Sequence, residues 1–332
     1  MPFFYQAIAW TILALVGLGC SVNVTQSSHA HEENSADNRS ESPSVLISAE
    51  ELKQILDSNH DDVRIIEAST DLKKYQKGHI PGAVYVHWLD DMISSQRPDL
   101  YSNPTSEQLA DLMSQKGISN QHRIIIYDRF ASRLSTRLYW TLKCYDHKQV
   151  QILNGGYQMW QSKYELSDKT PDYPATKFLA SPPRPELLAG FDFVKSHLND
   201  PKVTFIDGRP KDQYTGKQPG KVYHTGKPHA NKGHIPAAAN VFWKDNFNPD
   251  GTFKSVPELK KLYADAGVQP DKCVVTYCNE GLHAAPPWFV LTELLSHKDV
   301  RLYDNSMGEW ANADNPVETK TNSDQQPVPP KP

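Results

Sequence analysis

The sequence predicts an α/β protein with two repeated halves, each a mostly parallel sheet flanked by helices. The first observation is an internal repeat of three matched segments in the same order. The second is that short apolar runs alternate with amphipathic stretches, which is typical of a parallel sheet covered on both faces. The third is the stretch 167–186, whose five prolines indicate an extended linker between the halves.

The repeated segments keep nearly constant spacing. GHIPGAVYVHW begins at Gly78 and GHIPAAANVFW at Gly233, an offset of 155 residues. RIIIYD ends at Asp128 and parallels CVVTYC, which ends at Cys278, an offset of 150; LNGGYQMW parallels LYDNSMGEW at the same offset. Chance rarely places three such matches in one order, so the two halves are expected to share one fold.

In the second half, VTFID and CVVTYC are predicted to be buried strands. Helices are expected over residues 255–267 and 286–297. The first begins with Ser255 as a cap and carries Glu258 three residues later. The second has two prolines in its first turn, where a missing N–H group costs nothing.

Residues 1–20 contain no charged side chain and have an apolar centre, which is typical of an export signal. Cys20 follows Gly17-Leu18-Gly19 and resembles a bacterial lipobox, which predicts a lipid anchor. Cleavage after Ser28-His29-Ala30 and an uncleaved membrane anchor are the alternatives. The sequence therefore predicts an exported, periplasmic protein. Its three remaining cysteines leave at least one thiol free in that oxidising compartment.

The layout between the termini follows from composition. Residues 21–44 lack apolar periodicity and are predicted to be a disordered tether, as is the tail 319–332. The first domain is expected over 45–166, the linker over 167–186 and the second domain over 187–318. The net charge of −4 predicts no nucleic-acid partner, because such binding usually requires a basic domain.

Cys278 ends an apolar run at the edge where parallel sheets bind ligands. The following loop and helix start converge there into a cradle that favours negative charge. We therefore expect Cys278 to have a depressed pKa and to be a thiolate near neutral pH. Gly281 is expected to let the loop turn tightly. A buried structural thiol is the alternative, and we expect it for Cys144 and for Cys273, roughly 16 Å from Cys278 along the strand.

Four features together resemble one family, the tandem-domain rhodanese-type sulfurtransferases, over about residues 46–318. They are the paired GHIP segments, the Asp-x-Arg of Asp207 and Arg209, the strand-Cys-loop, and the closing Trp310. TYCNEGLHAAPPWFVLTELL followed by VRLYDNSMGEW is most similar to exported proteobacterial members.

The resemblance implies that Cys278 attacks the outer sulfur of a small donor such as thiosulfate and forms a persulfide. A thiol or cyanide then accepts the sulfur in a second half-reaction, with ping-pong kinetics and no metal or organic cofactor. It also implies that Asp207 and Arg209 lie at the substrate site. The active loop is Asn279, Glu280, Gly281, Leu282 and His283.

The same resemblance implies that the first domain is inactive, because Asp128 stands where the second domain has Cys278. A carboxylate cannot carry a transferable sulfur. The first domain is then expected to supply a wall of the active-site cleft. Within the active loop, His283 is expected either to shuttle a proton or orient an acceptor, or only to stack on the loop.

Two positions depart from the family pattern. Glu280 and Gln213 stand where its thiosulfate enzymes place cations, and Glu280 should raise the pKa of a nearby thiolate. The Glu67/Asp207 offset is 140 and the GHIP offset is 155, so the second half carries a 15-residue insertion. We expect the basic stretch 210–232 to lie over the cleft and supply the missing charge, with Lys221 as the best candidate. The alternative is a solvated loop that makes no contact with Cys278.

The same residues argue against metal-binding and phosphatase functions. His224, His229 and His234 lack recognised ligand spacing, so no metal site is predicted, and the recurrence of His234 as His79 favours a structural role. A phosphatase would need an arginine at Ala284 to clamp the oxyanion. An exported persulfide carrier that serves a protein partner stays open, as does, less favoured, an enzyme specific for 3-mercaptopyruvate.

Overall fold

The computed structural model describes residues 44–58, 60–96, 100, 102–223 and 226–319. Both candidate processing sites of the predicted export signal lie outside these residues, as do nearly all of the predicted tether and tail. Among the described helices, none combines the length and apolarity needed to cross a membrane.

Each half contains one five-stranded sheet, and every pairing between its strands is parallel. The strand orders are β1-β5-β4-β2-β3 and β6-β10-β9-β7-β8, so the repeat is also a repeat of topology. The predicted α/β class with two parallel sheets is confirmed. The strands are β1 Leu46–Ile47, β2 Val63–Ser69, β3 Ala83–His87, β4 Arg123–Tyr127, β5 Val150–Leu153, β6 Leu188–Ala189, β7 Val203–Asp207, β8 Ala239–Asn240, β9 Cys273–Tyr277 and β10 Val300–Tyr303.

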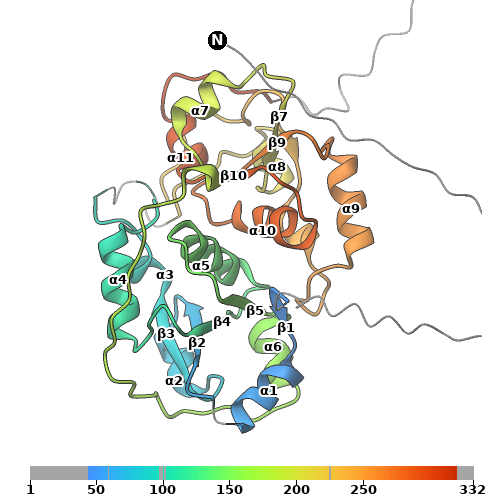
Figure 1. The fold of residues 1–332 in the computed structure, drawn as a ribbon. Coiled ribbons are helices and arrows are strands. Elements are labelled where there is room, and N and C mark those ends of the chain that lie inside the picture. The colour runs from blue at the N-terminus through green and yellow to red at the C-terminus, as the bar shows by residue number, and fades with distance from the viewer. Residues whose placement is uncertain (1–43, 59, 97–99, 101, 224–225, 320–332) are drawn as a thin grey trace, which may run out of the picture. The chain divides into compact units, whose positions relative to one another are not determined.

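Helices connect the strands and cover both faces of each sheet (Figure 1). In the first half they are α1 Ala49–Asp57, α2 Leu72–Lys77, α3 Trp88–Asp91, α4 Ser106–Gln115, α5 Arg133–Cys144 and α6 Gly156–Gln161. In the second half they are η1 Pro185–Leu187, α7 Phe191–Ser196, α8 Lys211–Tyr214, η2 Trp243–Asn246, α9 Val256–Asp265, α10 Ala285–Phe289, the π-helical turn η3 Val290–Leu294, and α11 Ser306–Trp310.

The two helices predicted in the second half are present. In α9, Ser255 and Glu258 form the reciprocal capping box that their spacing predicts. The other predicted helix begins with its prolines inside α10, but it then widens into the π-helical turn η3 and ends at Leu294. That helix is therefore shorter and less regular than its sequence pattern indicates.

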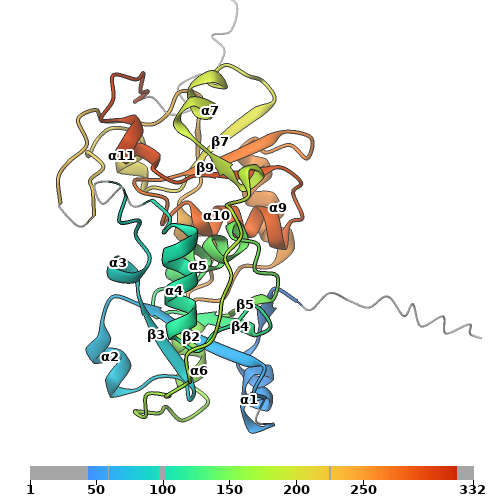
Figure 2. The same cartoon turned by 60° about the vertical axis from the view of Figure 1, so that its left-hand side comes forward.

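One apolar cluster runs through both halves. It joins the faces of the sheets that carry α4 and α5 to those that carry α9 and α10. Figures 1 and 2 both show α5 lying against α10, where the rings of Tyr139 and Phe289 meet edge-on with centroids 4.9 Å apart. The opposite faces have their own clusters, beneath α1 and α6 and beneath α7 and α11.

The GHIP segments make the same contacts in each half. The His79 ring stacks on Tyr75 with centroids 4.0 Å apart, and its Nδ1 donates to the Tyr75 carbonyl at 2.8 Å. The His234 ring stacks on Tyr214 at 3.8 Å, and its Nδ1 donates to the Tyr214 carbonyl at 2.7 Å. The structural role predicted for His234 is confirmed.

The linker is extended, as its prolines predict, but it packs on the first half along its length. The Phe178 side chain is buried in the shared apolar cluster. The Tyr173 hydroxyl donates to the carbonyl of Gly82 at 3.1 Å. These contacts fix the linker against the first half.

Candidate active site

Cys278 lies one residue beyond β9, at the carboxyl edge of the second sheet. Its side chain is 1% exposed. It opens into a pocket of about 120 Å³ that combines the active loop with part of the basic insertion. The pocket is lined by Gln213, Lys221, Tyr223, Cys278, Asn279, Glu280, Leu282 and His283.

Backbone N–H groups of the loop point at the sulfur. The N–H of Glu280 donates to Cys278 Sγ at 3.4 Å, and that of His283 does so at 3.2 Å. Two N–H groups directed at one atom stabilise negative charge on the sulfur or on an atom bound to it. The cradle expected from the strand-loop-helix pattern is therefore present.

Ser306, after β10, holds the loop from behind. Its Oγ accepts from the N–H of Cys278 at 3.0 Å and from that of Gly281 at 3.1 Å, and donates to the Tyr303 carbonyl at 2.7 Å. Sequence reasoning missed this residue. A signal exists in the repeat, because Ser306 lies at φ +49° where the first half has Gly156 at φ +54°.

Two glycines are required by close approaches. Gly281 has φ +74°, and a Cβ there would lie 2.5 Å from Arg137 Nη1 and 2.7 Å from the Asp304 carbonyl oxygen. Its predicted role in the turn is confirmed. Gly208 separates Asp207 from Arg209, and a Cβ at that position would lie 2.4 Å from the carbonyl oxygen of His283.

Asp207 and Arg209 form a buried ion pair behind the pocket. The Arg209 side chain is 1% exposed, its Nη2 donates to Asp207 Oδ2 at 2.6 Å, and it also donates to the Gly233 carbonyl at 2.7 Å. Neither residue lines the pocket. These bonds tie both side chains to the sheet framework, and their predicted contact with the substrate stays a prediction.

The first half builds an equivalent pair from another part of the chain. Arg129, which follows β4, donates to Glu67 at 2.7 Å and to the carbonyl of Gly78. Gly78 and Gly233 are the first residues of the two GHIP segments. The ion pair therefore recurs in a half that has no thiol at this edge, which supports a framework role for it.

The protonation of Cys278 differs from the expectation. Burial raises the pKa of the Cys278 thiol, and the N–H groups of Glu280, His283 and Ala284 oppose this rise only in part. The expected depressed pKa is wrong for the free protein, because loss of hydration exceeds the stabilisation by the loop amides. The charge of Asp207 raises the pKa of Cys278 further, whereas the sequence predicts this effect from Glu280.

Glu280 is a buried acid inside the pocket. Its side chain is 5% exposed, and Oε2 accepts from the N–H of Tyr223 at 3.0 Å. Its Oε1 is buried with no hydrogen-bond partner among the described residues. Burial raises the pKa of Glu280 to about 7, so this carboxyl changes charge near neutral pH.

The basic insertion lies on the active loop. Gln213 Oε1 accepts from Asn279 Nδ2 at 2.9 Å, and the His229 ring bonds Asn279 Oδ1 at 3.1 Å. An antiparallel bridge between Lys221 and Pro228 closes this part of the insertion. The alternative of a solvated loop without contact to the site is excluded, because Lys221 lines the same pocket as Cys278.

His283 is held as a neutral ring. It stacks on Trp243 with centroids 5.0 Å apart and 17° between the planes, and its Nε2 accepts from Arg133 Nη1 at 3.3 Å. Burial, followed by the charges of Arg133 and Lys244, lowers the pKa of His283 to about 3. A ring with this low pKa is neutral near pH 7, which disfavours the expected proton shuttle, while the expected role in orienting an acceptor stays a prediction. The ring stacks on Trp243 rather than on the active loop.

Asp128 fills the corresponding cradle in the first half. Its Oδ1 accepts from the N–H groups of Phe130 and Ser132 at 2.6 and 3.1 Å. Its Oδ2 accepts from those of Leu134 and Ser135 at 2.7 and 2.8 Å. An internal carboxylate thus occupies the place that the sulfur takes in the second half.

The remaining thiols lie away from this site. Cys144 and Cys273 are free, and burial raises the pKa of both, to about 12 for Cys273. Within the described part of the chain, no group of three or more His, Cys, Asp or Glu side chains is arranged to hold a metal ion.

Comparison with known proteins adds independent evidence. The Rhodanese-like domain family matches residues 48–163 and 191–313. A Haloferax volcanii protein named as a candidate thiosulfate sulfurtransferase is 32% identical over 81% of this chain and 93% of its own length. The sulfur carrier protein TtuD of Thermus thermophilus is 34% identical over 81% of this chain and 94% of its own. The crystal structure of SseA from Escherichia coli, a 3-mercaptopyruvate sulfotransferase, superposes with a TM-score of 0.70 at 26% identity, covering 79% of this chain and 98% of that one.

Proposed function

Because the chain belongs to the rhodanese-like domain family, we propose that it is a sulfurtransferase that carries a sulfane sulfur as a persulfide on Cys278. The observation that carries this proposal is the pair of N–H groups, from Glu280 and His283, directed at a buried thiol in a small pocket. The relatives named as thiosulfate sulfurtransferases support the same class of reaction.

The first half-reaction begins when Cys278 loses its proton, since burial favours the thiol in the free protein. The thiolate attacks the outer sulfur of the donor. A new S–S bond forms, the S–S bond of thiosulfate breaks, and its electron pair leaves on sulfite. The loop N–H groups then donate to the anionic persulfide.

In the second half-reaction an acceptor thiolate or cyanide attacks the outer sulfur of the persulfide. The sulfur passes to the acceptor, and the electron pair of the broken S–S bond returns to Cys278 as thiolate. No net oxidation or reduction of the protein takes place over the cycle. The protein alternates between the free thiolate and the persulfide, and sulfite leaves before the acceptor reacts, so the kinetics are ping-pong.

The charges that line the pocket bear on the donor. Lys221 favours an anionic donor, and ionised Glu280 opposes it. We propose that thiosulfate or a similar anionic sulfur donor binds against Lys221 when Glu280 is protonated. An anionic carbonyl donor such as 3-mercaptopyruvate would meet the same two charges.

A second candidate is a persulfide carrier that serves a protein partner. It is favoured by Glu280, because a carboxyl group inside a pocket of about 120 Å³ disfavours rapid turnover of small anions. A relative of the chain is named a sulfur carrier protein. A carrier would accept sulfur on Cys278 yet release little of it to cyanide or small thiols.

The deciding experiment is the intact mass of residues 31–332 after incubation with thiosulfate, beside Cys278→Ser. We expect the wild type alone to gain one sulfur atom, and cyanide to remove it. A gain that cyanide and small thiols leave in place would favour the carrier. No gain with thiosulfate, 3-mercaptopyruvate or a glutathione persulfide would contradict both candidates.

We also propose that residues 1–20 direct export to the periplasm, with Cys20 as the site of a lipid anchor or Ala30 as the end of a cleaved signal. Fractionation of cells that express the full chain, with and without Cys20→Ala, tests this. Recovery of both forms in the cytoplasm at full length would contradict export.

A further inference from the structure

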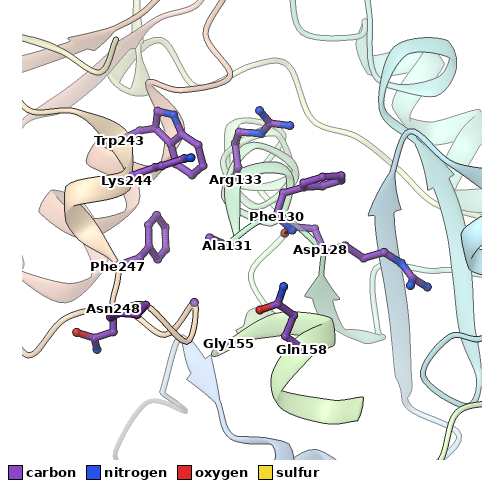
Figure 3. Close-up of a pocket in the computed structure, with 13 residues that line it drawn as sticks. Asp128, Phe130, Ala131, Arg133, Gly155, Gln158, Trp243, Lys244, Phe247 and Asn248 are labelled. Atoms are coloured by element: carbon purple, nitrogen blue, oxygen red, sulfur yellow. Dashed lines mark hydrogen bonds between the residues drawn. The ribbon is translucent and has the colours of Figure 1, made fainter. Parts of the chain in front are cut away.

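A second, larger pocket lies apart from Cys278. It has a volume of about 550 Å³ and is formed by the Asp128 loop of the first half and residues 243–251 of the second (Figure 3). In Figure 3, Trp243, Lys244, Phe247 and Asn248 face Phe130 and Gln158 across it. This volume is within the usual range for sites that bind small organic molecules.

The pocket carries excess positive charge. Arg133 and Lys244 line it, and neither has a carboxylate within ion-pair distance among the described residues. Arg133 Nε is buried and has no hydrogen-bond partner there. Arg129 also lines the pocket, but Glu67 balances its charge. The Asp128 carboxyl group adds at most one negative charge, and its two oxygens already accept from four backbone N–H groups.

Its walls are also aromatic. Trp243 and Phe247 lie on the side of the second half, and Phe130, which is 39% exposed, lies on the side of the first. Trp243 and Phe247 are buried, at 5% and 7% exposed, so Phe130 is the ring most open to a ligand. The Arg133 guanidinium lies 5.4 Å from the centroid of Phe130, and Lys244 Nζ lies 5.6 Å from that of Trp243, so cations and rings adjoin on the pocket wall. A ligand that has both an anionic group and a flat apolar body uses both features, whereas an inorganic anion or a neutral arene uses only one.

The pocket is physically connected to the active loop through two of its residues. Trp243 stacks on the His283 ring, and Arg133 donates to His283 Nε2. The backbone N–H of His283 in turn donates to Cys278 Sγ at 3.2 Å. A ligand that moves Arg133 or Trp243 therefore acts on a group that holds the reactive sulfur.

We propose that this pocket is a second binding site, for an organic anion with a flat apolar body, and that its occupancy changes the reactivity of Cys278. The anionic group binds between Arg133 and Lys244, and the flat body lies among Phe130, Trp243 and Phe247. The site uses the edge of the first sheet that corresponds to the Cys278 edge of the second, where Asp128 leaves no room for sulfur chemistry.

The test uses 2-naphthalenesulfonate as probe with the 31–332 protein, and isothermal titration as readout. We expect binding to weaken about tenfold in Lys244→Gln, the effect of losing one charged donor. Phe130→Ala should weaken it as well, and Lys260→Gln, an exposed lysine on α9, should leave it unchanged. Thermal unfolding of each variant at the wild-type temperature shows that the fold is intact.

Two comparison ligands test the chemical class of ligand that the pocket binds. Inorganic sulfate and the neutral 2-naphthalenemethanol should each bind at least tenfold more weakly than the probe, because each lacks one of the two features. Equal binding of the probe to wild type, Lys244→Gln and Phe130→Ala would overturn the proposal, as would equal binding of 2-naphthalenemethanol.

A separate measurement tests whether occupancy of this pocket changes the reactivity of Cys278. Probe at a concentration equal to its Kd for the wild type should change the rate at which iodoacetamide alkylates Cys278 in the wild type, and should change that rate much less in Lys244→Gln, whose occupancy at this concentration is about a tenth. An unchanged rate in the wild type would overturn the regulatory part. Neither binding nor alkylation requires sulfur transfer, so these results are independent of the proposed function.

Discussion

Arg137 of the first half forms an ion pair with Asp304 of the second, with Nη1 2.5 Å from Oδ1. The Arg137 side chain is fully buried on α5, and Asp304 directly follows β10, two residues before Ser306 begins α11. The same Nη1 leaves no space for a Cβ at Gly281. The first half thus braces the active loop of the second through a buried charge.

Arg137→Met should destabilise the protein by about 3 kcal/mol, because it removes the ion-pair partner of Asp304, whose side chain is 17% exposed and, among the described residues, keeps only the N–H of Asn103. Urea unfolding at constant pH measures this. Arg301→Met is the matched control, since Arg301 pairs with Asp299 where both side chains are partly exposed, and it should cost under about 1 kcal/mol. Equal losses in the two variants would contradict the bracing role.

Gly281→Ala should lower sulfurtransferase activity and stability together. The substitution adds a Cβ to a residue at φ +74° and places it against Arg137 and Asp304. Gly267→Ala provides the control for backbone strain alone, because Gly267 has φ +82° and no atom within 4 Å of the added Cβ. The control should lose about 1 kcal/mol with normal activity. Normal activity in Gly281→Ala would show that the loop can move aside.

The raised pKa of Cys278 predicts how its alkylation depends on pH. Burial favours the thiol, so the iodoacetamide rate should keep rising through the range in which an ordinary thiol titrates. A rate that levels off near neutral pH would show a preformed thiolate instead. Peptide mapping must confirm that Cys278, rather than Cys273, carries the label.

Glu280 predicts a pH-dependent KM for thiosulfate. Below about pH 7 the carboxyl is neutral and Lys221 faces the donor alone; above it the carboxylate repels the donor. KM should therefore rise with pH through about 7, by roughly tenfold for one nearby like charge. Glu280→Gln should keep the low KM across this range. A wild-type KM that is constant from pH 6 to pH 8 would contradict this assignment.

Lys221→Ala should raise the KM for thiosulfate about tenfold with a smaller effect on kcat, because it removes a cation that lines the pocket. Lys232→Ala is the matched control, since Lys232 is an exposed lysine of the same insertion. Steady-state kinetics at pH 6, where Glu280 is protonated, give the cleanest comparison. Equal KM values for Lys221→Ala and Lys232→Ala would place the donor elsewhere.

Several features follow from the sequence by itself. The repeat, the parallel sheets and the position of Cys278 after β9 depend on local apolar patterning and on turns, which neighbouring residues determine. The resemblance made Lys221 the best candidate for a donor-binding cation but left a solvated loop as the alternative, and the fold places Lys221 in the pocket of Cys278. The role of Ser306 could not be predicted locally, because its Oγ accepts from the N–H groups of Gly281 and Cys278, which lie 25 and 28 residues away in the sequence.

Tertiary structure alone decided the charge states of the site. The thiol form of Cys278, the neutral ring of His283 and the pKa of Glu280 near 7 all come first from burial, which no local pattern reports. Arg133 and Arg137 act on the active loop from about 150 residues away, because α5 packs against α10. Solvation free energies depend on everything that surrounds a group, so sequence locates the reactive residues and the packed fold decides their chemistry.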